Sequence, residues 1–71
     1  MHITYHAGER FLQRVFGWST YTKKEVIRAM KLLKRDLQDI QSSRGKIILP
    51  TFPDYYGITK KGALVTIIPK R

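Results

Sequence analysis

The sequence contains no cysteine, which excludes a disulfide framework and any thiolate metal site. Acidic residues are few, with 5 Asp plus Glu against 14 Lys plus Arg in 71 residues, so the formal net charge is +9. Long apolar runs are also missing, because the longest, at 47–49 and 63–65, span three residues, whereas a membrane helix needs about 20. The N-terminus lacks the basic start and apolar stretch of a signal peptide, so we expect a cytoplasmic protein without a membrane partner.

The length and charge indicate one small basic domain over residues 1–71. A chain of this size buries only about 60% of its unfolded surface, yet a hydrophobic content of 42% favours folding over disorder. Residues 1–41 carry eight basic and four acidic residues, and residues 42–71 carry six and one. This excess along the whole chain indicates a polyanionic partner such as RNA or another nucleic acid, and plain solubility is the alternative explanation.

The hydrophobic pattern predicts helices first and strands afterwards. We expect a first helix over about 6–16, and Gly8 lies on its apolar face, where another element can approach closely. The capping box Thr22-Lys23-Lys24-Glu25 predicts a second helix that runs to about residue 40. Strands are predicted at 46–49, 55–59 and 63–68, and a three-residue loop with a bulge joins the last two.

These elements make the expected fold class α+β, with two N-terminal helices packed on a three-stranded antiparallel sheet. Residues 3–5 are either a short strand or an extended lead-in. The helices are expected to pack on the sheet through Phe11, Val15, Val26, Met30, Leu33 and Leu37.

Three residues of the first helix, His6, Arg10 and Arg14, are spaced four apart on its polar face. An imidazole exchanges a proton near neutral pH, and guanidinium groups bind phosphate and stabilise transition-state charge. The set would suit cleavage of RNA by attack of the 2′-hydroxyl, without a metal or other cofactor. An ordinary solvated helix face has the same spacing, and this alternative stays open.

The start His-Ala-x-x-Arg-x-x-x-Arg at 6–14, the amphipathic second helix and the strand ending in Val-Thr-Ile-Ile at 65–68 resemble a family of small bacterial and phage domains. That family is related to the RelE-like and barnase-like ribonuclease toxins. The resemblance implies an endoribonuclease with helices first and a small antiparallel sheet after them. It also implies His6, Arg10 and Arg14 as the catalytic site, with Thr66 or a basic residue of the sheet assisting them. An acidic antitoxin would then be a partner that covers the basic face.

A basic stripe opposite the apolar side of the second helix, together with the hairpin tip, is the candidate nucleic-acid surface. Its residues are Lys24, Arg28, Lys31, Arg35, Lys60 and Lys61. Five aromatic residues are candidates for stacking on bases: Tyr5, Trp18, Tyr21, Tyr55 and Tyr56. Packing within the fold is the expected role of most of them. His2 and His6 lack a third ligand, so no metal site is expected. The alternative to a ribonuclease is a non-catalytic phage or plasmid factor that binds nucleic acid or a host protein.

Overall fold

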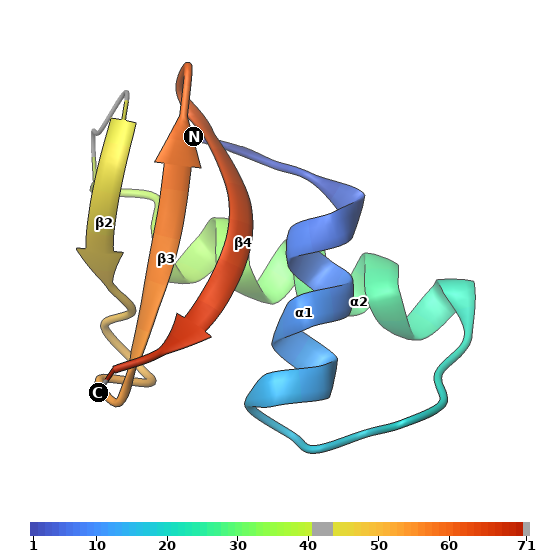
Figure 1. The fold of residues 1–71 in the computed structure, drawn as a ribbon. Helices are drawn as coiled ribbons and strands as arrows, with labels where there is room; N and C mark the ends of the chain where they lie inside the picture. The colour runs from blue at the N-terminus through green and yellow to red at the C-terminus, as the bar shows by residue number, and fades with distance from the viewer. Residues whose placement is uncertain (41–43, 71) are drawn as a thin grey trace.

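The computed structural model describes residues 1–40 and 44–70. It contains two helices and four strands (Figure 1). In chain order they are β1 (His2–Ile3), α1 (Tyr5–Arg14), α2 (Lys23–Asp36), β2 (Arg44–Ile48), β3 (Tyr55–Lys60) and β4 (Ala63–Pro69). The α+β class is therefore confirmed. In the described ranges no helix is long and apolar enough to cross a membrane.

The four strands form one mixed sheet in the order β1-β4-β3-β2, in which β1 runs parallel to β4 and the other pairs are antiparallel. The prediction of three antiparallel strands after the helices is therefore only partly right, because a fourth strand precedes α1. This strand has two residues, too few for an alternating pattern to be visible. It is defined by long-range bonds to β4, from His2 N–H to the Gly62 carbonyl (3.2 Å) and from Thr4 N–H to the Leu64 carbonyl (3.1 Å).

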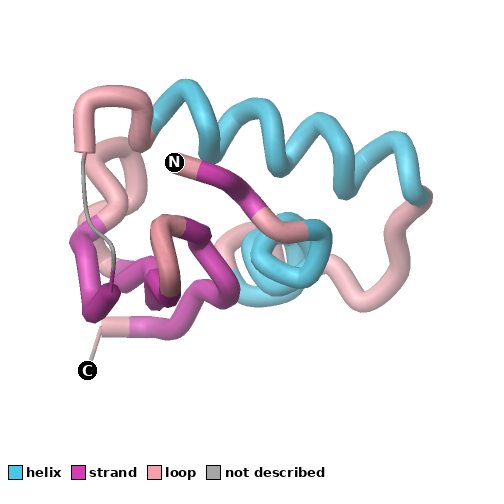
Figure 2. Tube along the Cα trace, turned by 90° about the horizontal axis from the view of Figure 1, so that it is seen from above, coloured by secondary structure: helices cyan, strands magenta, loops and turns pink. Residues whose placement is uncertain are grey.

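The helices pack on one side of the sheet, as the two views show (Figures 1 and 2). α2 crosses behind the sheet in Figure 1, while α1 lies beside β4 and also packs against α2. Of the six predicted packing residues, four are buried and two are partly buried against the core. The buried residues are Phe11, Val26, Leu33 and Leu37, and the partly buried ones are Val15 and Met30. The front face of the sheet carries no helix.

Local signals place both helices close to the predicted positions. The capping box of α2 is present, with Thr22 N–H donating to Glu25 Oε1 (2.7 Å) and Glu25 N–H donating to Thr22 Oγ1 (3.2 Å). α1 begins one residue earlier than predicted because Thr4 Oγ1 caps it, accepting from Ala7 N–H (3.1 Å). The same hydroxyl donates to the Leu64 carbonyl (2.9 Å), so the start of α1 is tied to β4.

The β3–β4 hairpin differs in detail from the prediction. Its turn has two residues, Lys61 and Gly62, with φ of 51° and 76°, which is the left-handed pair of a tight hairpin turn. The irregularity lies further along, because Thr59 pairs with Leu64 whereas Ile58 pairs with Thr66. One extra residue on β4 shifts the alternation, so that Leu64 and Ile67 both face the core.

At Gly8 the two helices approach each other closely, as its position on the apolar face predicted. A Cβ at this position would lie 2.8 Å from Met30 Cγ and 3.0 Å from the carbonyl oxygen of Val26. We expect Gly8→Ala to lower the free energy of unfolding by about 1–3 kcal/mol, because overpacking outweighs the gain in helix propensity of about 1 kcal/mol.

Urea unfolding of the wild type and the variant would measure this difference. Lys34→Ala, at an exposed position of α2, is the control and should change stability by about 0.5 kcal/mol or less. A Gly8→Ala variant that is more stable than the wild type would show that the helices can separate at no cost.

Candidate nucleic-acid interface

The residues predicted to form a basic stripe on the second helix do lie together on one exposed face of α2. The capping box begins the helix, and the burial of Val26, Ala29 and Leu33 sets which side faces the core. At about 100° per residue, the four basic positions fall within an arc of about 60° on the opposite side. These residues, called the basic stripe below, are Lys24, Arg28, Lys31 and Arg35, and all four are exposed.

The charge of this stripe is not neutralised within the described part of the chain. Among the side chains that the structure describes, no Lys or Arg pairs with a carboxylate, and only the His6 imidazole lies within salt-bridge distance of an acidic group, that of Glu9. Two further acidic side chains are used locally, since Glu25 caps α2 and Asp36 accepts from the Thr51 backbone N–H. The stripe therefore presents a positive field that attracts a polyanion.

The two hairpin lysines, Lys60 and Lys61, line one groove together with Lys46 and Ile58. Lys61 lies in the turn next to Gly62, whose carbonyl accepts from the backbone of His2. His2 in turn lines a groove between β1 and α2 together with Lys31 and Lys34. The turn is thus joined through the His2 backbone to the groove that Lys31 and Lys34 line, and His2 was not among the predicted nucleic-acid contacts.

Lys60 lies on the outer face of the sheet. Its neighbour Thr59 is buried, and alternation along β3 therefore directs Lys60 to the same side as Ile58. Lys46 of β2 pairs with Ile58 and holds its Nζ 4.9 Å from the ring centre of Tyr56. As expected for adjacent strand residues, Tyr55 points to the opposite side and packs against the core.

On α1, two predicted catalytic residues join a polar cluster with residues that sequence reasoning missed. His6 Nδ1 lies 3.4 Å from Glu9 Oε1, and Tyr21 donates its hydroxyl to Glu9 Oε2 (3.3 Å). Gln13 Nε2 donates to the Tyr21 hydroxyl oxygen (2.7 Å), and Arg10 Nη1 donates to Gln13 Oε1 (2.6 Å). These five residues are called the α1 cluster below.

The sequence holds a signal for only part of this cluster. Glu9 follows His6 by three positions, a spacing that brings side chains together on a helix. Tyr21 lies in the connection between the helices, where no periodic pattern predicts its position.

The other two predicted catalytic residues lie apart from the α1 cluster. Arg14 Nη1 donates to the carbonyl of Ile67 (3.0 Å), and the Tyr55 hydroxyl donates to the carbonyl of Arg14 (3.0 Å). Since β1 pairs only with residues 63–64 of β4, Arg14 contacts the edge of β4 beyond the end of β1. Thr66 pairs with Ile58 on the outer face of the sheet, away from the helices.

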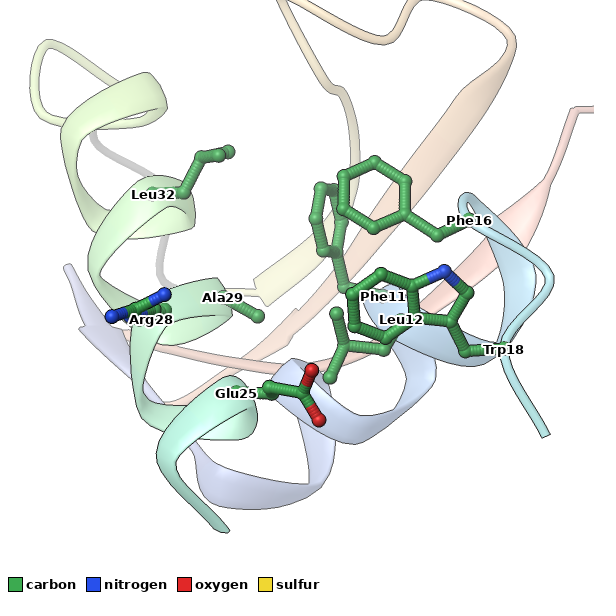
Figure 3. Close-up of a pocket in the computed structure, with 8 residues that line it drawn as sticks. All are labelled: Phe11, Leu12, Phe16, Trp18, Glu25, Arg28, Ala29 and Leu32. Carbon is green, nitrogen blue, oxygen red and sulfur yellow. The ribbon is translucent and has the colours of Figure 1, made fainter. Parts of the chain in front are cut away.

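Exposed aromatic rings line a small apolar pocket between the end of α1 and the side of α2 (Figure 3). Its volume is about 190 Å³. Phe16 and Trp18 form one wall, and Arg28, Ala29 and Leu32 of α2 form the other. Trp18 keeps 41% of its surface exposed and Phe16 44%, so both rings remain accessible to a ligand here.

The described residues contain no group of three or more His, Asp or Glu side chains placed to hold a metal ion. The chemistry on offer is therefore that of cations, an imidazole, carboxylates and aromatic rings. No protein-family model, curated protein or solved structure matches this chain, so a function has to be argued from its own residues and their geometry.

Proposed function

We propose that this chain binds nucleic acid, with RNA as the first candidate, through the basic stripe of α2 and its extension along Lys34 and His2. One observation carries the proposal: four cationic side chains share one exposed helix face, and none of them is paired with a carboxylate of the described residues. An acidic residue four positions away on the same helix can pair with such a cation, so these charges could have been neutralised within α2. An external polyanion is the fitting counter-charge.

The chemistry of the stripe favours contacts with phosphates. Arg28 and Arg35 can each bind a phosphate with two parallel hydrogen bonds, whereas Lys24 and Lys31 act as point charges. Contacts of this kind position a nucleic acid but carry no sequence information. We therefore expect binding with little sequence preference and with a strong dependence on salt.

Salt titration tests this expectation. Four phosphate contacts give a slope of log K against log salt of about −3. Raising salt from about 50 to about 200 mM should therefore weaken binding by about 50- to 150-fold. Replacing both Lys31 and Arg35 with Ala should make the slope shallower by about 1.4–1.8, as measured by anisotropy of a labelled oligonucleotide.

A double variant with the same change of charge provides the control. Lys23 lies on α2 outside the stripe, and Lys70 follows the end of β4, so Lys23→Ala with Lys70→Ala should leave the slope nearly unchanged. If both double variants lower the slope equally, the charge acts without a defined surface. An absence of binding at low salt would remove nucleic acid and leave an acidic protein, such as an antitoxin, as the partner.

A second candidate function, a metal-independent ribonuclease, is favoured by the α1 cluster. The His6 imidazole stands beside a carboxylate in one bonded network with Tyr21 and Arg10, and 56% of the His6 side chain is exposed. In this reaction a base removes the proton of the 2′-hydroxyl, the 2′-oxygen attacks the phosphorus, and an acid protonates the departing 5′-oxygen. His6 and Glu9 are the proton carriers on offer, with Arg10 to hold the phosphate. The resemblance to ribonuclease toxins supports the same candidate.

A further inference from the structure

The apolar pocket beside α2 has features that core packing does not explain. Three of its lining side chains, Phe16, Trp18 and Leu32, each leave 41–44% of their surface exposed. They gather at one place on the molecule, although single exposed apolar residues are normally scattered. Large apolar side chains gathered around a concavity typically mark a binding site.

The rings of this pocket are already held in place. The ring centres of Phe16 and Trp18 lie 5.6 Å apart, and Phe11, which is fully buried, meets Phe16 edge to face at 5.1 Å. The backbone N–H of Trp18 donates to the Leu12 carbonyl (3.1 Å), and this bond fixes the backbone from which the indole projects. A ligand that stacks on Trp18 would therefore lose little binding free energy to the ordering of the indole ring.

The same pocket borders the basic stripe. Arg28 lines the pocket and is also the second member of the stripe. Glu25, about one turn before Arg28 on α2, also lines the pocket, and the α2 cap orients its carboxylate through the Thr22 backbone N–H. Aromatic faces and a carboxylate acceptor thus border one concavity, and the Arg28 guanidinium is directed away from the rings (Figure 3).

We propose that this pocket holds an unstacked base of a single-stranded nucleic acid whose phosphates lie along the basic stripe. The proposal rests on the nucleic-acid binding proposed above and adds the class of ligand. Bases present a flat face that stacks on aromatic side chains, whereas an intact duplex keeps its bases inside the stack. The carboxylate of Glu25 can accept a hydrogen bond from an N–H group on the base edge. We therefore expect the chain to prefer single strands over duplexes.

Trp18 is the only tryptophan in the chain, so its fluorescence reports directly on the pocket. The probes are a uridine RNA of about 12 nucleotides, an abasic strand of the same length, and a duplex of the same length. The uridine strand should quench Trp18 emission and bind most tightly. The abasic strand and the duplex keep the phosphates but present no free base, so they should bind more weakly and leave the emission nearly unchanged.

Substitutions separate stacking from charge. Trp18→Ala should weaken binding of the uridine strand by about 5- to 150-fold, the effect of losing one stacked base, and should hardly change binding of the abasic strand. Trp18→Phe keeps a ring and should restore most of the affinity. Tyr5→Ala is the matched control, because Tyr5 is equally exposed at 41% but lies at the start of α1, away from the pocket. Urea unfolding of each variant checks that it folds.

The outcomes distinguish this proposal from the one on which it rests. Equal affinity for the three nucleic acids, with unchanged Trp18 emission, would overturn the pocket proposal and leave phosphate binding by the stripe intact. Emission that changes with protein concentration alone would place a second copy in the pocket. Quenching by an acidic peptide of Glu and Leu, but not by the uridine strand, would place a protein there. Either result would overturn the proposal, and binding of none of the nucleic acids would overturn both.

Discussion

His6→Ala is expected to reduce metal-free cleavage of RNA by about 10²–10⁴-fold, the usual contribution of a general acid or base. RNA affinity should stay nearly the same, because a neutral imidazole adds little to phosphate binding. The measurement incubates the protein with long RNA in the presence of EDTA, maps the new ends and compares equilibrium binding. Arg10→Ala should weaken both cleavage and binding, since a guanidinium holds the phosphate in both states.

The second histidine provides the control for this experiment. His2 lies in β1, outside the α1 cluster, and lines the groove beside Lys31 and Lys34 that belongs to the proposed binding surface. His2→Ala can therefore weaken RNA binding, but the cleavage rate at saturating RNA should stay unchanged. Cleavage that survives His6→Ala would exclude His6 as a proton carrier. If the wild type cuts no RNA with EDTA, with divalent metal or on translating ribosomes, the α1 cluster is not a ribonuclease site, and the nucleic-acid-binding protein remains.

Leu33→Ala is expected to lower the free energy of unfolding by about 2–5 kcal/mol, because Leu33 is fully buried and truncation leaves a cavity. The side chain lies in the core cluster together with Phe11, Leu37 and Leu64. A loss of this size is a large fraction of the 5–15 kcal/mol that stabilises a typical domain. Urea unfolding, read by far-UV circular dichroism, measures the difference.

The neighbouring residue provides a matched control. Leu32 has the same side chain, but it leaves 41% of its surface exposed on the other side of α2, so Leu32→Ala should cost clearly less, below about 1 kcal/mol. Equal losses at both positions would contradict the helix phase that also places the basic stripe. A loss below about 0.5 kcal/mol at Leu33 would put this residue outside the core.

The helices and their exposed faces could be predicted because their signals are local. The capping box of α2 joins residues three apart, and its apolar side repeats with the helix period. Lys31 and Leu33 are two residues apart, so a helix necessarily turns them to different sides. The meander of β2, β3 and β4 was predictable for a similar reason, because neighbouring strands are joined by short connections.

The parts that sequence reasoning missed depend on contacts between distant segments. β1 exists through bonds to residues about 60 positions away, and Arg14 meets a carbonyl 53 positions further along the chain. Tyr21 enters the α1 cluster from the connection that follows α1. Hydrophobic periodicity identifies none of these partners. It shows which side of a helix or strand is apolar, but not which other segment packs against that side.

Local spacing was enough to predict the two helices, the exposure of the basic stripe and the burial of Leu33, because hydrogen bonding and helix geometry relate each of these to residues within a few positions. In contrast, the packing of distant segments places Trp18 on the Arg28 side of α2, His2 between the hairpin turn and the stripe, and Thr66 on the face away from α1. Each of these relations requires the packing of two elements and the register of a sheet. Both are set by the complementarity of whole surfaces, which residue spacing along one chain does not specify.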